Sequence, residues 1–198
     1  MALDEKTCLL LLDLQNDLVH EEGKFGSQGL AGIVSGRGVL ENAARALAAA
    51  RDAGVPVGHV RVAFRADDAD VISRHPRVAH LRGVGAMTDG AWGGAIHDAV
   101  APRDGEPVFT KQSVNPFVST NLANWLHRHG ITRVVMGGVA TNQVVEATMR
   151  HCDDIGLLPV ALEDCCASPK PDLHDFAIQN IFPMFGTVTT TAEFVANL

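Results

Sequence analysis

CLLLLDLQND, residues 8–17, is an apolar run of strand length that ends in an acid. Similar runs alternate with helical patterns along the chain, which is typical of βαβ units and a parallel sheet. We expect six strands, at 8–13, 56–64, 107–111, 132–138, 157–163 and 186–190. Right-handed crossovers then favour an α/β fold, a Rossmann-like three-layer αβα arrangement with six parallel strands in the order 3-2-1-4-5-6.

Helical patterns fill the intervals between these strands. We expect helices at 38–53, 119–129, 141–154, roughly 171–182 and 191–197. Gly54, Gly130 and Gly156 stand at or near three helix ends, where glycine readily adopts a left-handed conformation. The segment 65–105 is irregular and rich in His and Arg, with only a short helix expected near 92–99. We interpret it as an excursion that faces the substrate, with a plain surface loop as the alternative.

Length and composition favour one soluble domain, 1–198, with 46% hydrophobic and 20% charged residues. The formal net charge of -7 argues against nucleic acid and against an anionic membrane as partners, so a small-molecule substrate is expected. The chain starts without a basic segment followed by an apolar core, and no apolar run reaches the roughly 18 residues of a membrane span. We therefore expect a cytoplasmic location.

The four cysteines, Cys8, Cys152, Cys165 and Cys166, lack the paired spacing of a zinc site and are expected to be packing residues. Cys165 and Cys166 directly follow a predicted strand and should pack on alternate sides. A strained vicinal disulfide or a redox sensor is the alternative for this adjacent pair.

Three segments converge on one edge of the predicted sheet. Asp13 ends the first strand, Lys111 ends the third, and residues 137–144 leave the fourth. Ligands of such sheets bind outside the carboxyl ends of the strands, at the point where the strand order reverses. Partial burial raises the pKa of an acid at this edge and a nearby ammonium lowers it, so Asp13 and Lys111 suit proton transfer near neutrality. A surface or helix-capping role is the alternative for Asp13, and Asp17 is expected to be structural.

These segments closely resemble the isochorismatase-like superfamily, also called the cysteine hydrolases, whose usual triad is Asp, Lys and Cys. The resemblance rests on CLLLLDLQND, on PVFTK followed by QSVNPF, and on GGVATNQVVE. It implies that Asp13 and Lys111 are catalytic and that the nucleophile position is occupied by Val144. It also implies an oxyanion hole, formed by a cis peptide in the turn Val139-Ala140 together with the amide of Val144. Family members associate through outer helices, so a homodimer or homotetramer is expected.

Several other side chains are candidates for roles near this turn. Gln143, at the mouth of the turn, is a substrate-binding candidate or a solvent-facing residue, and Gln15 and Phe117 are further substrate-binding candidates. Thr141 is expected to cap the helix rather than act as a nucleophile. Cys152 lies about 12 Å beyond the nucleophile position along the same helix, so it cannot replace the missing thiol.

No cofactor and no metal are expected. The turn after Asp13 lacks a Gly-x-Gly-x-x-Gly fingerprint for dinucleotides. Asp67-Asp68-Ala69-Asp70 followed by His75 does not reproduce the metal site of the nicotinamidases.

A valine cannot form the thioester on which members with the Cys depend. The resemblance offers a second route, because isochorismatases proper also lack the thiol and use the aspartate to protonate a vinyl ether. Their corresponding position is typically Gly, which is smaller than Val144. We therefore expect a thiol-independent isochorismatase-like hydrolase, or a lyase-like enzyme, that acts on a small polar metabolite by Asp/Lys acid-base chemistry. The alternatives are a catalytically silent member that binds a ligand or partner, and an amidohydrolase with another nucleophile.

Overall fold

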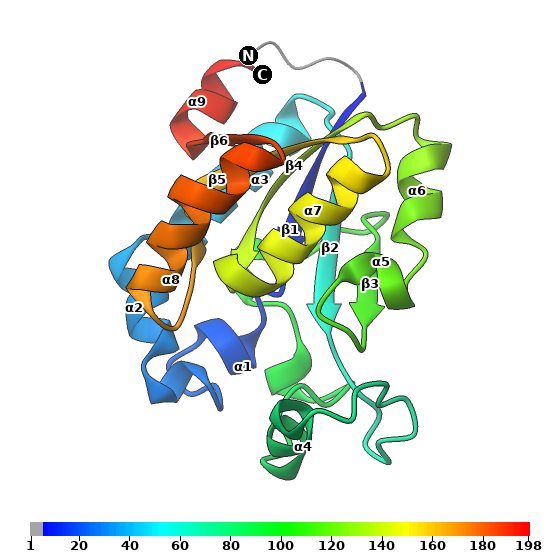
Figure 1. Cartoon of the computed structure of the whole chain (residues 1–198), viewed down its shortest axis with the longest axis vertical. Coiled ribbons are helices and arrows are strands. Elements are labelled where there is room, and N and C mark those ends of the chain that lie inside the picture. Colours follow the sequence, from blue (N-terminus) through cyan, green and yellow to red (C-terminus); the bar gives the residue numbers. More distant parts are fainter. Residues whose placement is uncertain (1–5) are drawn as a thin grey trace.

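A six-stranded parallel sheet forms the centre of the molecule, as Figure 1 shows for the computed structural model, which describes residues 6–198. The strands are β1 (Thr7–Leu12), β2 (Val57–Val62), β3 (Val108–Lys111), β4 (Arg133–Val139), β5 (Leu158–Ala167) and β6 (Thr187–Thr189). Their order is β3-β2-β1-β4-β5-β6, and every neighbouring pair is parallel. The predicted fold class and strand order are confirmed.

Helices cover both faces of the sheet, with α7 in front of it and α3 behind it in Figure 1. The helices are α1 (Asn16–Val19), α2 (Leu30–Gly36), α3 (Val39–Asp52), α4 (Pro76–Gly83), α5 (Pro116–Ser119), α6 (Leu122–Arg128), α7 (Glu146–Asp154), α8 (Pro171–Phe176) and α9 (Thr191–Ala196). Short 3-10 turns occur at Gly26–Gln28, Trp92–Gly94, Asp98–Val100 and Phe182–Met184, and π-helical turns at Thr141–Val145 and Ala177–Ile181. Among residues 6–198, no helix is both long and apolar enough to cross a membrane.

The apolar run of β1 is continuous because both faces of this central strand are covered. Leu9 and Leu11 pack into a cluster with α3 and α9, whereas Leu10 and Leu12 pack into a second cluster with α6 and α7. All four side chains are at most 2% exposed. Complete burial of a leucine contributes about 1.5–3 kcal/mol, so this strand anchors both layers and fixes the place of the acid that follows it.

The helix α4 corrects the sequence analysis, which expected no helix in the segment after β2 until residue 92. Pro76 occupies the first turn of α4, and the ring Nδ1 of His75 accepts a hydrogen bond from the backbone of that turn. Val78 and Leu81 are buried in a third, smaller apolar cluster. The expected helix near 92–99 consists only of short 3-10 turns.

Other boundaries differ as well. The helices α1 and α2 lie in an interval to which we assigned no helix. The expected helix 119–129 begins at Leu122, and α5 is a separate turn before it. Gly54, Gly130 and Gly156 have φ of 70°, 65° and 78°, which confirms the left-handed ends.

The sequence analysis expected Cys165 and Cys166 directly after a strand that ends at residue 163. The strand β5 instead extends to Ala167, so both cysteines lie inside it. Cys165 packs on one face of the sheet and Cys166 on the other, as expected. All four cysteines are free and buried, which confirms their role as packing residues.

Candidate active site

Asp13 follows the last residue of β1 and is only 4% exposed. Its backbone has a φ of 56°, and its amide donates to the Val60 carbonyl of the neighbouring strand at 2.9 Å. Its Oδ1 has no hydrogen-bond partner among the described residues. Burial raises the pKa of Asp13, and the charge and hydrogen bond of Lys111 act in the opposite direction.

Lys111 is the last residue of β3 and is 1% exposed. Its Nζ donates to Asp13 Oδ2 at 2.8 Å and to the Ser113 carbonyl at 3.1 Å. Since the strand β2 separates β1 from β3, the side chain of Lys111 crosses the end of β2 to reach Asp13. Because the ammonium occupies Oδ2, the other carboxyl oxygen of Asp13 is left to accept or give a proton.

The turn after β4 lies beside this pair because β4 neighbours β1 in the sheet. A Cβ at Gly138 would collide with the backbone of Leu12, so glycine allows the two strand ends to approach closely. The peptide bond between Val139 and Ala140 is cis. The π-helical turn that follows carries Val144, whose side chain is buried.

Thr141 does not cap this turn, so the capping role expected for it is wrong. Ala140 is the N-cap residue, and no side chain caps the turn. The Thr141 hydroxyl instead lies 2.8 Å from Nδ1 of His174, and both residues are buried. Burial, followed by the charge of Arg37, lowers the pKa of His174 to about 4. Nothing in the sequence indicated this contact, because His174 is an isolated histidine on α8 that belongs to no motif.

A cavity of about 520 Å³ opens over these residues. Of the residues singled out from the sequence, those that line it are Asp13, Lys111, Val139, Ala140, Gln143 and Val144. The opposite walls come from segment 18–33 and from segment 72–87, which includes α4. In Figure 1, α4 lies beyond the carboxyl ends of β2 and β3, so part of the irregular segment 65–105 does face the cavity.

Gln15 and Phe117 are placed elsewhere and are not among the lining residues. The Gln15 amide nitrogen donates to the carbonyls of Val62 and Gly94, and its oxygen accepts from the Val62 amide. These bonds tie the end of β1 to β2. Phe117 stacks on His151 with ring centroids 4.2 Å apart.

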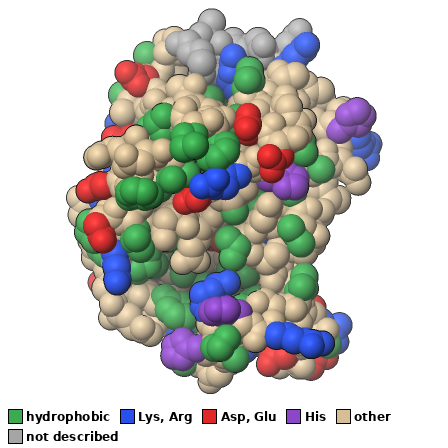
Figure 2. Space-filling model, viewed as in Figure 1, with side chains coloured by type: hydrophobic (Ala, Val, Ile, Leu, Met, Phe, Trp, Pro, Cys, Tyr) green, Lys and Arg blue, Asp and Glu red, His purple; other side chains and the backbone are tan. Residues whose placement is uncertain are grey.

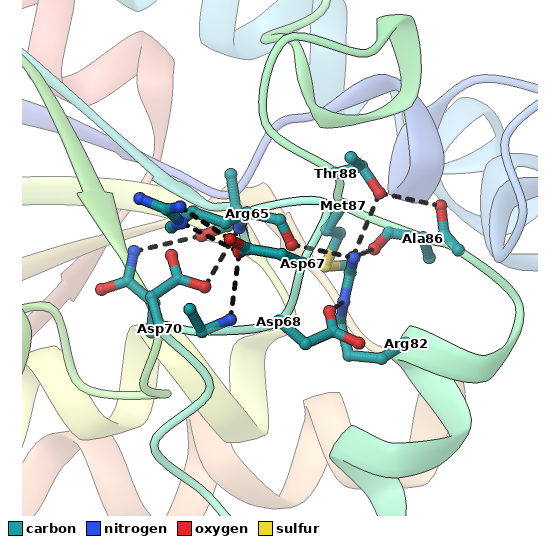
Figure 3. Close-up of polar contacts among 12 residues, drawn as sticks. Arg65, Asp67, Asp68, Asp70, Arg82, Ala86, Met87 and Thr88 are labelled. Carbon is teal, nitrogen blue, oxygen red and sulfur yellow. Dashed lines mark hydrogen bonds and ion pairs between the residues drawn. The ribbon is translucent and has the colours of Figure 1, made fainter.

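The wall formed by α4 is fastened at its C-terminal end. Arg82 donates to Asp68 Oδ1 at 2.6 Å, to the Thr88 hydroxyl and to the carbonyl of Ala86, as Figure 3 shows. Its guanidinium also lies over the ring of Phe64, 5.4 Å from the centroid. These contacts hold the end of α4 against the segment that leaves β2.

A second set of contacts comes from the segment after α1. Lys24 Nζ donates to the carbonyls of Val84 and Gly85 at 2.7 Å each. The buried carboxylate of Asp17 accepts from the amides of Lys24 and Met87, so Asp17 has the structural role expected for it. Lys24 was not singled out from the sequence, and Arg82 was noted only as one of the arginines of the irregular segment 65–105.

Acidic, cysteine and histidine side chains show no metal-binding arrangement in residues 6–198. No group of three or more of them is placed to hold an ion in that part of the chain.

Comparisons with known proteins agree with this architecture. The model of the isochorismatase domain matches residues 7–193. The ureidoacrylate amidohydrolase RutB of Methylobacterium radiotolerans is 31% identical over 217 residues, which cover 100% of this chain and 82% of the relative. The maleamate amidohydrolase of Pseudomonas putida is 27% identical over 202 residues, covering 100% and 89%. A cysteine hydrolase from Pseudomonas syringae shares the fold with a TM-score of 0.87 at 22% identity, covering 100% of this chain and 94% of that one. This chain belongs to the isochorismatase family.

Proposed function

We propose that this chain hydrolyses a small metabolite by proton transfer through Asp13, without a thiol nucleophile. The observation that carries the proposal is the buried pair of Asp13 and Lys111 at the wall of a cavity of about 520 Å³. A cavity of this size suits a small organic ligand.

A thiol is missing where the resemblance would place the nucleophile. Val144 lines the cavity, and its side chain has no atom that can attack a carbonyl carbon. None of the described cavity-lining residues is a cysteine. Burial raises the pKa of Cys152 and of Cys166 to about 12, so neither thiol supplies a thiolate near neutral pH.

Amide bonds are the favoured substrate bonds, because both sequence relatives are named amidohydrolases. In the proposed reaction Asp13 accepts a proton from a water molecule as that water adds to the carbonyl carbon. Asp13 then gives the proton to the leaving nitrogen as the carbon–nitrogen bond breaks, which yields an acid and an amine. Lys111 holds Oδ2 throughout, and the unpaired Oδ1 is the atom that exchanges the proton.

When water adds to the substrate, negative charge develops on its carbonyl oxygen and must be stabilised by hydrogen-bond donors. Backbone amides can do this without a thiol. Ala140 and Val144 line the cavity, and their backbone amides are the proposed donors. A vinyl ether is the second candidate substrate, since a buried acid with a raised pKa can also protonate carbon.

A screen of small amides, carbamoyl compounds and vinyl ethers tests the proposal, with products followed by NMR for the wild type and for Asp13→Asn. We expect the variant to lose about 100-fold or more in rate, because asparagine keeps the shape but cannot carry the proton. Asp98→Asn changes an acid outside the cavity lining and serves as the control. Near wild-type turnover by Asp13→Asn would refute the proposal.

The second candidate function is a catalytically silent member that binds a ligand in the same cavity. Val144 at the expected nucleophile position favours it. Ligand-dependent thermal stabilisation without turnover of any compound in the screen would select this function over hydrolysis.

A further inference from the structure

The charges on the cavity wall have the opposite sign to the charge of the whole chain. Besides Asp13 and Lys111, which neutralise each other, the titratable side chains of the lining are Arg77 and His80. The formal net charge of the chain is -7, so the chain as a whole repels anions. The cavity lining instead contains one carboxyl group, that of Asp13, which is already paired, together with the permanent cation of Arg77 and the histidine His80. This combination favours an anionic ligand.

Arg77 is available for such a ligand. Its side chain is exposed, and the described residues offer it no ion pair and no side-chain hydrogen bond. Two other arginines, one on α4 and one on α7, are paired: Arg82 with Asp68 and Arg150 with Glu146. Arg77 also lines a neighbouring hollow of about 340 Å³, so it stands where the two spaces meet.

Arginine and histidine side chains also gather on the surface around this point. Figure 2 shows Lys or Arg and His side chains at the lower end of this face, with Asp or Glu side chains beside them, where Figure 1 places α4. Arg74, His75, Arg77 and His80 are all exposed there. This cluster can raise the local concentration of an anionic ligand.

The position of Arg77 is set by the fold. Val78, the next residue, is buried in the cluster under α4, and Arg82 and Lys24 hold the end of the same helix. A guanidinium on a fixed helix can bind a carboxylate with two parallel hydrogen bonds.

The remaining walls determine the rest of the ligand. They are mainly apolar and include Phe25, Ile33, Val62, Phe64, Leu81 and Met87. An apolar body suits these walls, a carboxylate suits Arg77, and the reacting bond would lie at Asp13.

We propose that Arg77 is a specificity-determining residue that selects ligands with an apolar body and a carboxylate. The placement of the reacting bond rests on the proposed function, but the preference for a carboxylate does not. Arg77 takes no part in the proton transfer.

Calorimetric binding tests this inference with two pairs of probes of equal shape, phenylacetate with phenylacetamide and hexanoate with hexanamide. We expect the wild type to bind the acid about tenfold more tightly than the amide in at least one pair, which corresponds to about 1.4 kcal/mol. Arg77→Gln should remove this preference. Arg74→Gln changes an exposed arginine three residues away that does not line the cavity, and should retain it.

Two results would overturn the inference. One is a wild type that binds neither acid more tightly than its amide, including one that binds no probe. The other is an acid preference that persists in Arg77→Gln. Binding needs no turnover, and Asp13→Asn should keep the acid preference, so failure here is distinct from failure of the proposed hydrolysis. With a substrate in hand, Arg77→Gln should raise KM more than it lowers kcat.

Discussion

Nζ of Lys111 lies 2.8 Å from Oδ2 of Asp13, although the strand β2 separates their strands in the sheet. Both side chains are almost completely buried, at 1% and 4% exposure. Removal of one member of such a pair leaves the other without compensation and typically costs about 3–5 kcal/mol. An acid can escape part of that cost by taking up a proton, whereas a lysine must release one.

Lys111→Met is therefore expected to raise the pKa of Asp13 further. Both contributions of Lys111 lower that pKa, while burial, which raises it, remains. Carboxyl-carbon NMR of protein labelled at aspartate measures the shift, and the Asp13 resonance is identified by its absence from Asp13→Asn. An unchanged Asp13 titration in Lys111→Met would contradict the prediction.

The same variant should lose stability as the pH rises. With the folded-state pKa of Asp13 above its ordinary value of 3.8, the folded protein holds a proton that the unfolded chain has already released. The free energy of unfolding then falls with rising pH between those two values. Urea denaturation of Lys111→Met and of the wild type across this range measures the difference.

Arg82→Gln is expected to loosen the wall formed by α4. The Arg82 side chain is 9% exposed, and its guanidinium binds a carboxylate, a hydroxyl and a carbonyl, which glutamine cannot all replace. Hydrogen exchange should become faster in Pro76–Gly83 and around Met87. Arg65→Gln is the control, because the Arg65–Asp67 pair in Figure 3 is exposed at 64% and 55% and contributes little. Equal exchange in both variants would show that Arg82 does not hold α4.

His174→Gln is expected to reduce the loss of stability in acid. The pKa of His174 is about 4 in the folded protein against an ordinary 6.5, so acid protonates the unfolded chain first. The free energy of unfolding of the wild type should fall as the pH drops from 6.5 to 4. Glutamine keeps a group that can bond to the Thr141 hydroxyl but does not titrate. His127→Gln, on the surface, should leave the slope of the wild type unchanged. Identical slopes in His174→Gln and the wild type would contradict the assignment.

The alternation of strand and helix patterns was sufficient to predict the sheet and its strand order. That order placed Asp13, Lys111 and the turn after β4 at one edge, where the strand order reverses. Those residues end buried strands, so their position follows from the strand order alone. Gln15 could not be placed in this way, because its amide serves backbone groups of Val62 and Gly94 that are distant in sequence.

The wall opposite the acid was harder to predict. Its helix α4 is short and carries Arg and His among few apolar residues, so the apolar pattern was weak. Pro76 after His75, followed by Val78 and Leu81 three residues apart, was the signal that could have revealed it. Arg77 gains its significance only from the cavity that α4 closes.

Val144→Cys decides whether the site keeps the geometry that would activate a thiol. The introduced sulfur would line the cavity with Asp13 and Lys111, where a base and a cation lower a thiol pKa. We expect iodoacetamide at neutral pH to alkylate this cysteine faster than a free thiol in solution.

Val145→Cys is the matched control, because Val145 is buried on the same turn and does not line the cavity, so its thiol should stay unmodified. The four native cysteines are buried and should react slowly in every variant. Alkylation of Val144→Cys no faster than a free thiol would mean that Asp13 and Lys111 do not act on this position. Loss of the native activity in Val144→Cys, with the fold intact by circular dichroism, would show that the valine side chain itself shapes the substrate site.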